Sequence, residues 1–336
     1  MTPTSAGSGM LKRMPAKSKK PDFKPPHKNL LLATRIFGAV GTLMLVADVI
    51  RNPTWPTPDK IFVLLTLVFM IFGRGWKLFK RLGPFVGLLL VYESFRSIVP
   101  QLNGHVNYRF LPAADKFLFR VDPTHWLQQH WWNGHVQWYD FFFYGFYMLH
   151  FILPISLALV IWKLRDKDYW RYIVTYLTVS FSAFIMFLVF PAAPPWMASE
   201  LHIITPITRI TSHVWQYLGI KDFPSLYNKL SPNPVAAMPS LHAAYATIFL
   251  LYVYKLFGKK WAALAAIYPL SIYLGTVYQG EHYVIDEIAG ILFGVGAYFA
   301  APYVLKGVTR AMKYTARKLQ PLAKRLQTRT DSSGVK

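Results

Sequence analysis

Eight apolar runs, most of them about 20 residues long, constrain the fold of this chain more than any other feature. A helix of roughly 20 apolar residues crosses the hydrocarbon core of a bilayer. Within lipid, every backbone polar group must be satisfied inside the protein, and a helix does this through its own hydrogen bonds. The sequence therefore predicts an all-α fold, a polytopic transmembrane helical bundle of about six to eight spans. The expected spans are about 29–50, 57–73, 82–100, 139–162, 172–190, 239–256, 261–278 and 284–304.

The composition is that of a membrane protein rather than a soluble one. Only 15% of the residues are charged and 54% are hydrophobic, whereas a soluble domain carries about 25% charged residues. We expect a transmembrane catalytic domain at 29–304, preceded by a basic, disordered N-terminal tail at 1–28. A basic cytoplasmic C-terminal tail is expected at 305–336, where 308–320 can lie along the membrane surface as an amphipathic helix.

The formal net charge of +22 raises the question of nucleic acid binding. The basic residues are instead concentrated beside the apolar runs, with seven in 1–28 and nine in 305–336. Basic segments next to membrane helices attract anionic lipid. We therefore expect anionic lipid at the basic tails and no nucleic acid partner.

Lysine and arginine also alternate between the two sides of the predicted bundle. When the N-terminus is placed inside, the Lys/Arg-rich connections all fall on the cytoplasmic side, which is the positive-inside pattern. The cytoplasmic segments are then 1–28, 74–81, 163–171, 257–260 and 305–336. The expected outer segments are 51–56, 101–138, 191–238 and 279–283. Both termini are therefore expected to be cytoplasmic.

Two short motifs place histidines at the outer ends of predicted spans. Pro239 and Ser240 form a turn followed by His242, and His282 is followed four residues later by Asp286. Residues four apart share a face of a helix, so the carboxylate can hold one imidazole nitrogen and leave the other free to attack. Because two spans separate the motifs, both histidines return to the same, extracytoplasmic or lumenal, side.

This arrangement favours phosphoryl transfer. His282 is expected to attack phosphorus while Asp286 orients its ring, and His242 is expected to protonate the leaving oxygen. The resulting phosphohistidine passes its phosphoryl group to water or to an alcohol. A single transmembrane histidine can also be only a hydrogen-bonded staple between helices. The pair, with its carboxylate and its Pro-Ser turn, favours chemistry instead.

The sequence predicts neither a metal nor a cofactor. The chain has no cysteine, which excludes disulfides and thiolate metal sites. Three histidines, His125, His130 and His135, are spaced by five residues. That spacing does not align them on one helix face, so they do not form an obvious ligand set.

The motifs resemble those of the membrane-bound type-2 phosphatidic acid phosphatase superfamily, and within it the inositol phosphorylceramide synthase-like (inositolphosphotransferase) branch. The superfamily's second motif, Pro-Ser-x-His, is matched at 239–242, and its third motif ends in His-x-x-x-Asp, matched at His282 and Asp286. The resemblance covers about residues 85–300 and implies a six-helix phosphatase-like core. Further matches to the synthase-like branch are Tyr92-Glu93-x-x-Arg96, Tyr147-x-x-His150-Phe151, Ala193-Pro194-Pro195-Trp196 and 280–290.

The resemblance implies the same roles for His282, His242 and Asp286 as the residues themselves do, and it leaves His150 as a supporting residue. One departure concerns the cation that neutralises the phosphate. The superfamily's phosphatases carry an arginine six residues before the nucleophile, where this chain has Thr276. Arg96 is the expected replacement, and a structural ion pair of Arg96 with its neighbour Glu93 is the alternative. The other expected phosphate-binding residues are Pro239, Ser240 and Tyr283.

Together these features predict an integral-membrane lipid phosphatase or phosphotransferase that cleaves a lipid phosphate ester at the extracytoplasmic or lumenal leaflet. Two alternatives stay open. In one, an inositol-phosphate-type headgroup is transferred from one lipid to another. In the other, the protein is a non-enzymatic lipid transporter or scramblase that uses the same intramembrane polar residues. The expected substrate partner is a lipid phosphate within the membrane.

Overall fold

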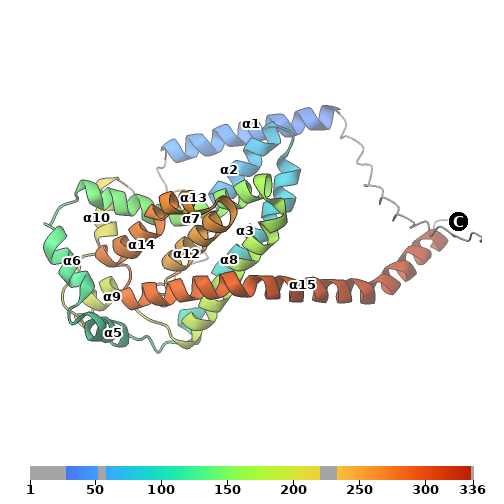
Figure 1. Ribbon diagram of the computed structural model, residues 1–336. Coiled ribbons are helices and arrows are strands. Elements are labelled where there is room, and N and C mark those ends of the chain that lie inside the picture. The colour runs from blue at the N-terminus through green and yellow to red at the C-terminus, as the bar shows by residue number, and fades with distance from the viewer. Residues whose placement is uncertain (1–27, 52–57, 220–232, 334–336) are drawn as a thin grey trace, which may run out of the picture.

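The computed structural model describes residues 28–51, 58–219 and 233–333, and these ranges form a helical bundle (Figure 1). Every predicted span falls on a helix or on a pair of helices. These are α1 (Lys28–Arg51), α2 (Pro58–Ile71), α3 (Gly75–Ser97), α7 (Trp138–Leu164), α8 (Asp166–Val189), α12 (Leu241–Phe257), the pair α13 (Lys259–Ala265) and α14 (Ile267–Tyr278), and α15 (Val284–Ser333).

The prediction of an all-α polytopic bundle is confirmed. Across the described ranges, six helical segments are long and apolar enough to cross a membrane, and two shorter apolar helices lie at Phe62–Ile71 and Leu241–Phe257. The same ranges hold no strand and only two isolated bridge pairs. The protein is therefore an integral, multi-pass membrane protein.

The last helix is longer than the predicted span 284–304. Helix α15 continues to Ser333, through the stretch 308–320 that was expected to be an amphipathic helix, so the described part of the basic tail extends it. Lysine and arginine are good helix formers, and a run of them ends an apolar span without ending the helix. The N-terminal tail predicted at 1–28 lies outside the described residues except for Lys28.

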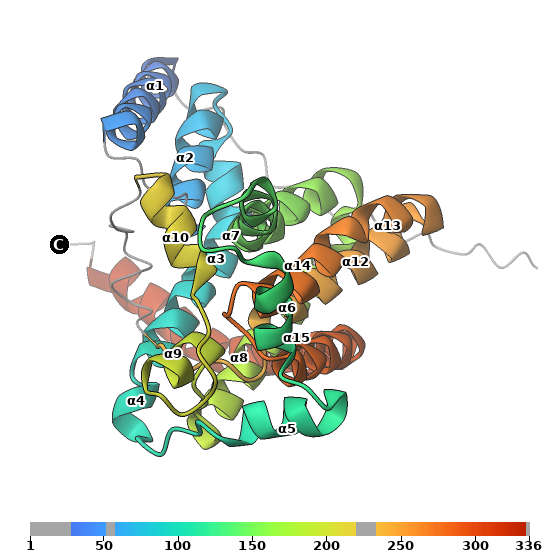
Figure 2. The same ribbon diagram turned by 90° about the vertical axis from the view of Figure 1, so that its left-hand side faces the viewer.

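Short helices occupy the two long connections that the sequence left without secondary structure. Figure 2 looks onto the end of the bundle where they gather. They are α4 (Val99–Leu102), α5 (Phe110–Phe119), α6 (Pro123–Trp131), α9 (Pro195–Glu200) and α10 (Ile210–Tyr217). Helix α15 begins at this same end and runs away from it (Figure 1).

Buried tyrosines fix the central helices against one another. The main core cluster draws on α3, α7, α8, α12 and α15. The hydroxyl of Tyr252 on α12 lies 2.8 Å from that of Thr175 on α8. The hydroxyls of Tyr245 and Ser180, on the same two helices, lie 2.6 Å apart. Buried hydroxyls need such partners, so these pairs align α12 with α8.

Two glycines allow α15 to approach the first turns of α12. A Cβ atom on Gly290 would lie 2.2 Å from the carbonyl oxygen of Ser240, and one on Gly294 would lie 2.7 Å from that of Ala244. No larger residue fits at these distances without moving the backbone. The close approach brings the first turn of α15 beside the first turn of α12, where the two histidine motifs lie.

Candidate active site

The Pro-Ser turn starts helix α12 and places His242 in its first turn. Ser240 is the N-cap, and its Oγ accepts a hydrogen bond from the backbone N–H of Ala243 at 3.2 Å. This is the usual role of serine at a helix start. Pro239 and Ser240 are both buried. The Ser240 backbone N–H donates to the carbonyl oxygen of Asp286 at 3.0 Å, which joins this turn to α15.

His282 and Asp286 meet, although in a different way from the predicted shared helix face. Helix α15 begins at Val284, so His282 lies in the turn just before it. Its Nδ1 is 3.4 Å from Oδ2 of Asp286, which lies in the first turn of the helix. The same Oδ2 accepts the backbone N–H of Tyr283 at 3.0 Å. The carboxylate is therefore held by both the ring and the backbone of this turn.

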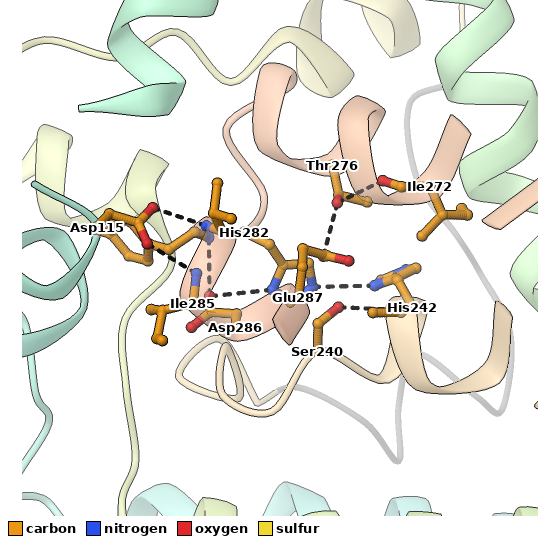
Figure 3. A network of polar contacts seen from close by, with 12 residues as sticks. Asp115, Ser240, His242, Ile272, Thr276, His282, Ile285, Asp286 and Glu287 are labelled. Carbon is orange, nitrogen blue, oxygen red and sulfur yellow. Dashed lines mark hydrogen bonds and ion pairs between the residues drawn. The ribbon is translucent and has the colours of Figure 1, made fainter. Parts of the chain in front are cut away.

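The two predicted histidines are in direct contact. Nδ1 of His242 lies 3.2 Å from Nε2 of His282, so Asp286, His282 and His242 form a continuous polar chain (Figure 3). The exposed fraction is 6% for His282 and 0% for Asp286, whereas His242 is half-buried. In the neutral form of His282, Nδ1–H donates to Asp286, and Nε2 is then the acceptor for Nδ1–H of His242.

The surroundings of His282 favour its charged form. Burial lowers the pKa of His282, but the hydrogen bond to Asp286 and the charges of Glu287, Asp286 and Glu281 outweigh burial, so the net shift is upward from 6.5. The same acids stabilise the positive charge that develops on the ring when Nε2 bonds to phosphorus. The geometry thus suits a nucleophilic histidine.

Asp115, which the sequence did not single out, caps the helix that carries Asp286. Its Oδ2 accepts the backbone N–H of Val284 at 2.8 Å, and its Oδ1 accepts that of Ile285 at 2.9 Å (Figure 3). Burial raises the pKa of Asp115 to about 6, against the lowering effect of these two bonds. An N-cap residue is normally adjacent in sequence to its helix. Because Asp115 is on α5, the sequence next to α15 could not reveal it as a cap.

Thr276, which stands where the superfamily's phosphatases have an arginine, binds a buried acid. Its Oγ1 donates to Oε1 of Glu287 at 2.8 Å, and both residues are buried. Glu287 follows Asp286 and contributes to the field at His282. Glu287 was not among the residues expected in the site, although its place beside Asp286 in the first turn of α15 was a usable signal.

The other side of the His242 ring is covered by helix α7. The rings of Tyr147 and His150 lie 4.4 and 4.2 Å from it, centroid to centroid, and Tyr147 is stacked on it. His150 also stacks on Tyr245 at 4.9 Å. His150 thus contacts the expected proton donor, which agrees with a supporting role. It shares a cavity of about 40 Å³ with Glu93 of α3.

Two arginines flank the histidine pair. Arg96 donates from Nη1 to Oε2 of Glu93 at 3.1 Å, so the predicted structural pair is present. Its charge also acts on His150 and His242. Arg96 is therefore near enough to His150 and His242 for its charge to act on them, and it is also paired with Glu93.

Arg209 is the second cation, and the sequence analysis did not find it. Its Nε and Nη2 donate to the two carboxylate oxygens of Glu281, at 2.8 and 3.3 Å. The guanidinium also lies 4.2 Å from the ring centre of Trp196, and Thr211 donates to the same carboxylate. Arg209 is therefore bonded to the residue that immediately precedes His282. Arg209 is in a long connection, where the sequence has no helical periodicity that would show which way its side chain points.

Tyr283, one of the expected phosphate-binding residues, has a buried side chain. Its side chain is only 1% exposed and packs in a cluster with Leu111, Ala192 and Ala237. Its backbone N–H, rather than its hydroxyl, contacts Asp286. In the structure its visible contribution is to hold the carboxylate.

The histidines of α6 bind their own neighbours. Nε2 of His125 lies 2.8 Å from Nε2 of Gln129, and Nδ1 of His130 lies 2.7 Å from the carbonyl oxygen of Trp126. Within the described ranges, no group of three or more acids or histidines is arranged to hold a metal ion.

Comparisons with known proteins agree with these motifs. A family model described as the PAP2 superfamily matches residues 110–300. The chain is 32% identical over 249 residues to phosphoinositol dihydroceramide synthase of Bacteroides thetaiotaomicron, which covers 68% of this chain and 79% of that protein. It is 22% identical over 325 residues to the inositol phosphorylceramide synthase catalytic subunit AUR1 of Saccharomyces cerevisiae, with 89% and 80% covered. No solved structure gives a significant match.

Proposed function

Because this chain belongs to the PAP2 superfamily and is a membrane lipid phosphatase or phosphotransferase, we propose that it transfers a phosphoinositol headgroup from a phospholipid to a ceramide-type lipid. The observation that carries the chemistry is the continuous chain from Asp286 through His282 to His242. The names of the two relatives supply the headgroup and the acceptor class.

In the first step, Nε2 of His282 attacks the phosphorus of the donor. A nitrogen–phosphorus bond forms, and the bond from phosphorus to the diacylglycerol oxygen breaks. His242 enters this step as the imidazolium, gives one proton to that oxygen and becomes neutral, while Asp286 stabilises the positive ring of His282 through Nδ1–H. The donor phosphate enters between the two rings, which are within hydrogen-bond distance of each other before it binds.

In the second step, a hydroxyl of the acceptor lipid attacks the same phosphorus. His242 accepts the hydroxyl proton, and the nitrogen–phosphorus bond to His282 breaks. The ring nitrogens return to their starting state, and the phosphoinositol group is now on the acceptor. Water in place of the acceptor gives the hydrolase reaction, so acceptor binding and water exclusion decide between transfer and hydrolysis.

Three elements of the site support phosphate binding. The start of α12 at Ser240 presents backbone N–H groups and the positive end of a helix dipole, which favour an anion. We propose that Arg96 and Arg209 neutralise the phosphate from the His242 side and from the His282 side respectively. Arginine suits this role because its planar guanidinium has several N–H donors. One can bind a phosphate oxygen while another stays bonded to the neighbouring carboxylate.

The reaction is proposed to take place at the extracytoplasmic or lumenal leaflet. The basic connections 163–171 and 257–260 follow the far ends of α7, which carries His150, and of α12, which carries His242, and 74–81 is at the end of α3 away from Arg96. By the positive-inside rule those ends face the cytoplasm, together with both termini. We also propose that 29–304 is the catalytic domain, with a family-like core at about 85–300 and basic tails that contact anionic lipid.

A mass-balance assay tests the transfer reaction. Purified protein receives labelled phosphatidylinositol with and without ceramide, and the products followed are diacylglycerol, free inositol phosphate and phosphoinositol ceramide. Transfer predicts a new sphingolipid, with one diacylglycerol released for each, that requires ceramide and is absent in His282→Asn. Inositol phosphate release that ignores ceramide would make the protein a hydrolase. Lipid movement between leaflets by His282→Asn, without any product, would make it a scramblase.

A further inference from the structure

A large cavity lies at the end of the bundle opposite the histidine pair. Its volume is about 760 Å³, and it lies between α3, with the turn before it, and the end of α7. His150 and Lys163 are both on α7, 13 positions apart. At 1.5 Å per residue this puts the cavity about 20 Å along the helix from the active site. It is therefore a separate feature from the catalytic pocket.

One part of this cavity is cationic. Arg74 and Lys77 come from the turn and first residues of α3, and Lys163 comes from the last turn of α7. All three side chains are exposed, so the cavity opens to the surface. None of the three takes part in an ion pair within the described ranges.

The acids nearest in sequence are already paired elsewhere. Asp166, at the start of α8, pairs with Arg81, and Asp168 pairs with Lys255 at 2.6 Å. The three cations of the cavity are therefore not neutralised by these carboxylates. A ligand that binds them must bring its own negative charge.

The rest of the lining is apolar. It consists of Phe69, Leu159, Val160, Trp162 and Leu164. Phe69 is on the shorter apolar helix α2 and the others are on α7, which is long enough to span a membrane, so the apolar wall follows these helices while the cations lie at their ends. A charged rim next to an apolar wall at the end of a span fits a molecule with an anionic head and a hydrocarbon chain.

We propose that this cavity is a binding site for an anionic phospholipid, distinct from the substrate site. The phosphate lies among Arg74, Lys77 and Lys163, and an acyl chain lies along Phe69 and the α7 wall. The volume is within the usual range of roughly 300–1,000 Å³ for small-molecule pockets. Free phosphate would use only the cationic half, whereas a lipid uses both halves.

Lipid titration of the purified protein in a neutral detergent tests this site. The probes are phosphatidylglycerol and phosphatidylcholine with identical acyl chains, and bound lipid is counted by native mass spectrometry. The cavity variant carries Arg74→Gln, Lys77→Gln and Lys163→Gln. The control carries Arg165→Gln, Lys167→Gln and Lys260→Gln, which remove the same charge at the same end of the bundle but outside the lining.

The proposal predicts that the cavity variant loses at least about tenfold in affinity for phosphatidylglycerol, while the control stays within about twofold of the unmodified protein. Phosphatidylcholine and inorganic phosphate should bind weakly to all three proteins. Equal losses in the variant and the control would overturn the proposal, because the binding would then follow net charge alone. Tight binding of inorganic phosphate would also overturn it.

A second measurement avoids dependence on the triple variant's folding. Trp162 lines the apolar wall, so phosphatidylglycerol with brominated acyl chains should quench its fluorescence more than brominated phosphatidylcholine does. Trp162→Phe should remove this difference, and Trp170→Phe, an exposed tryptophan outside the lining, should keep it. The same quenching by both lipids, or a difference that survives in Trp162→Phe, would contradict an occupied cavity.

Discussion

At the scale of single residues, the effect of Asp286 on His282 can be measured through the pH dependence of activity. Asp286 accepts from both His282 and the backbone of Tyr283, and it is fully buried. Its bond raises the pKa of His282, against the lowering effect of burial. Because attack requires a neutral Nε2, activity should rise with pH through the pKa of His282, at a pH above 6.5 in the unmodified protein.

Asp286→Asn should lower kcat by roughly 10³–10⁴ fold, the size seen when the acid of a catalytic triad is replaced by its amide. It should also move the acidic limb of the pH–rate profile to lower pH, since the shift that the carboxylate causes is lost. The measurement is kcat/KM of headgroup transfer from pH 5 to 9. An unchanged acidic limb would show that His282 is not the group that titrates.

The contributions of Arg96 and Arg209 to phosphate neutralisation can be distinguished by single substitutions. Arg209→Gln should lower kcat/KM by about 10² fold if the guanidinium neutralises phosphate next to His282, and Arg209→Lys should recover part of this loss. Arg165→Gln, at the far end of the bundle, is the matched control. Full activity in Arg209→Gln would leave neutralisation to Arg96 and would make the bond of Arg209 to Glu281 purely structural.

At the scale of elements, the start of α15 depends on a side chain from α5. Asp115 accepts two backbone N–H groups there, and burial raises its pKa to about 6 from an ordinary 3.8. Between these values the folded protein holds a proton that the unfolded chain has released. The contribution of this group to the free energy of unfolding therefore falls as pH rises from about 4 to about 6 and is constant above that.

Asp115→Asn should abolish that dependence and keep one of the two bonds, and Asp115→Ala should cost about 0.5–2 kcal/mol of stability through the lost cap. Denaturant titrations in detergent from pH 4 to 8 measure both effects. In the alanine variant kcat should fall with little change in KM, because the cap positions Asp286 and does not touch substrate. Parallel pH curves for Asp115→Asn and the unmodified protein would contradict this account.

The helices and the residues they carry differ in how far the sequence could predict them. All the spans were predictable, because a helix in lipid satisfies its hydrogen bonds locally and shows as an uninterrupted apolar run. His242, His282 and Asp286 were predictable because each motif is short and contiguous. Asp115 and Arg209 were not, because each reaches the site from a long connection and contacts a residue far away in sequence. Helix α15 extends past the predicted span because the apolar run, rather than the helix, ends at residue 304.

At the scale of the whole molecule, the absence of cysteine makes the proposed orientation directly testable. Single cysteines at Gln129 and Tyr217 should react with a membrane-impermeant maleimide added to intact cells, because both are exposed on the active-site end. Cysteines at Arg165 and Lys260 should react only after permeabilisation. The opposite pattern would invert the bundle and place the histidine pair at the cytoplasmic leaflet.

The central claim, transfer through a phosphohistidine, has a direct test. Purified protein is mixed with phosphatidylinositol without an acceptor, quenched without acid because phosphohistidine is acid-labile, and digested for mass spectrometry. A phosphoinositol adduct is expected on the peptide with His282, and it should be absent in His282→Asn and discharged by added ceramide. Rapid transfer with no adduct on any histidine, or an adduct elsewhere that survives in His282→Asn, would contradict it.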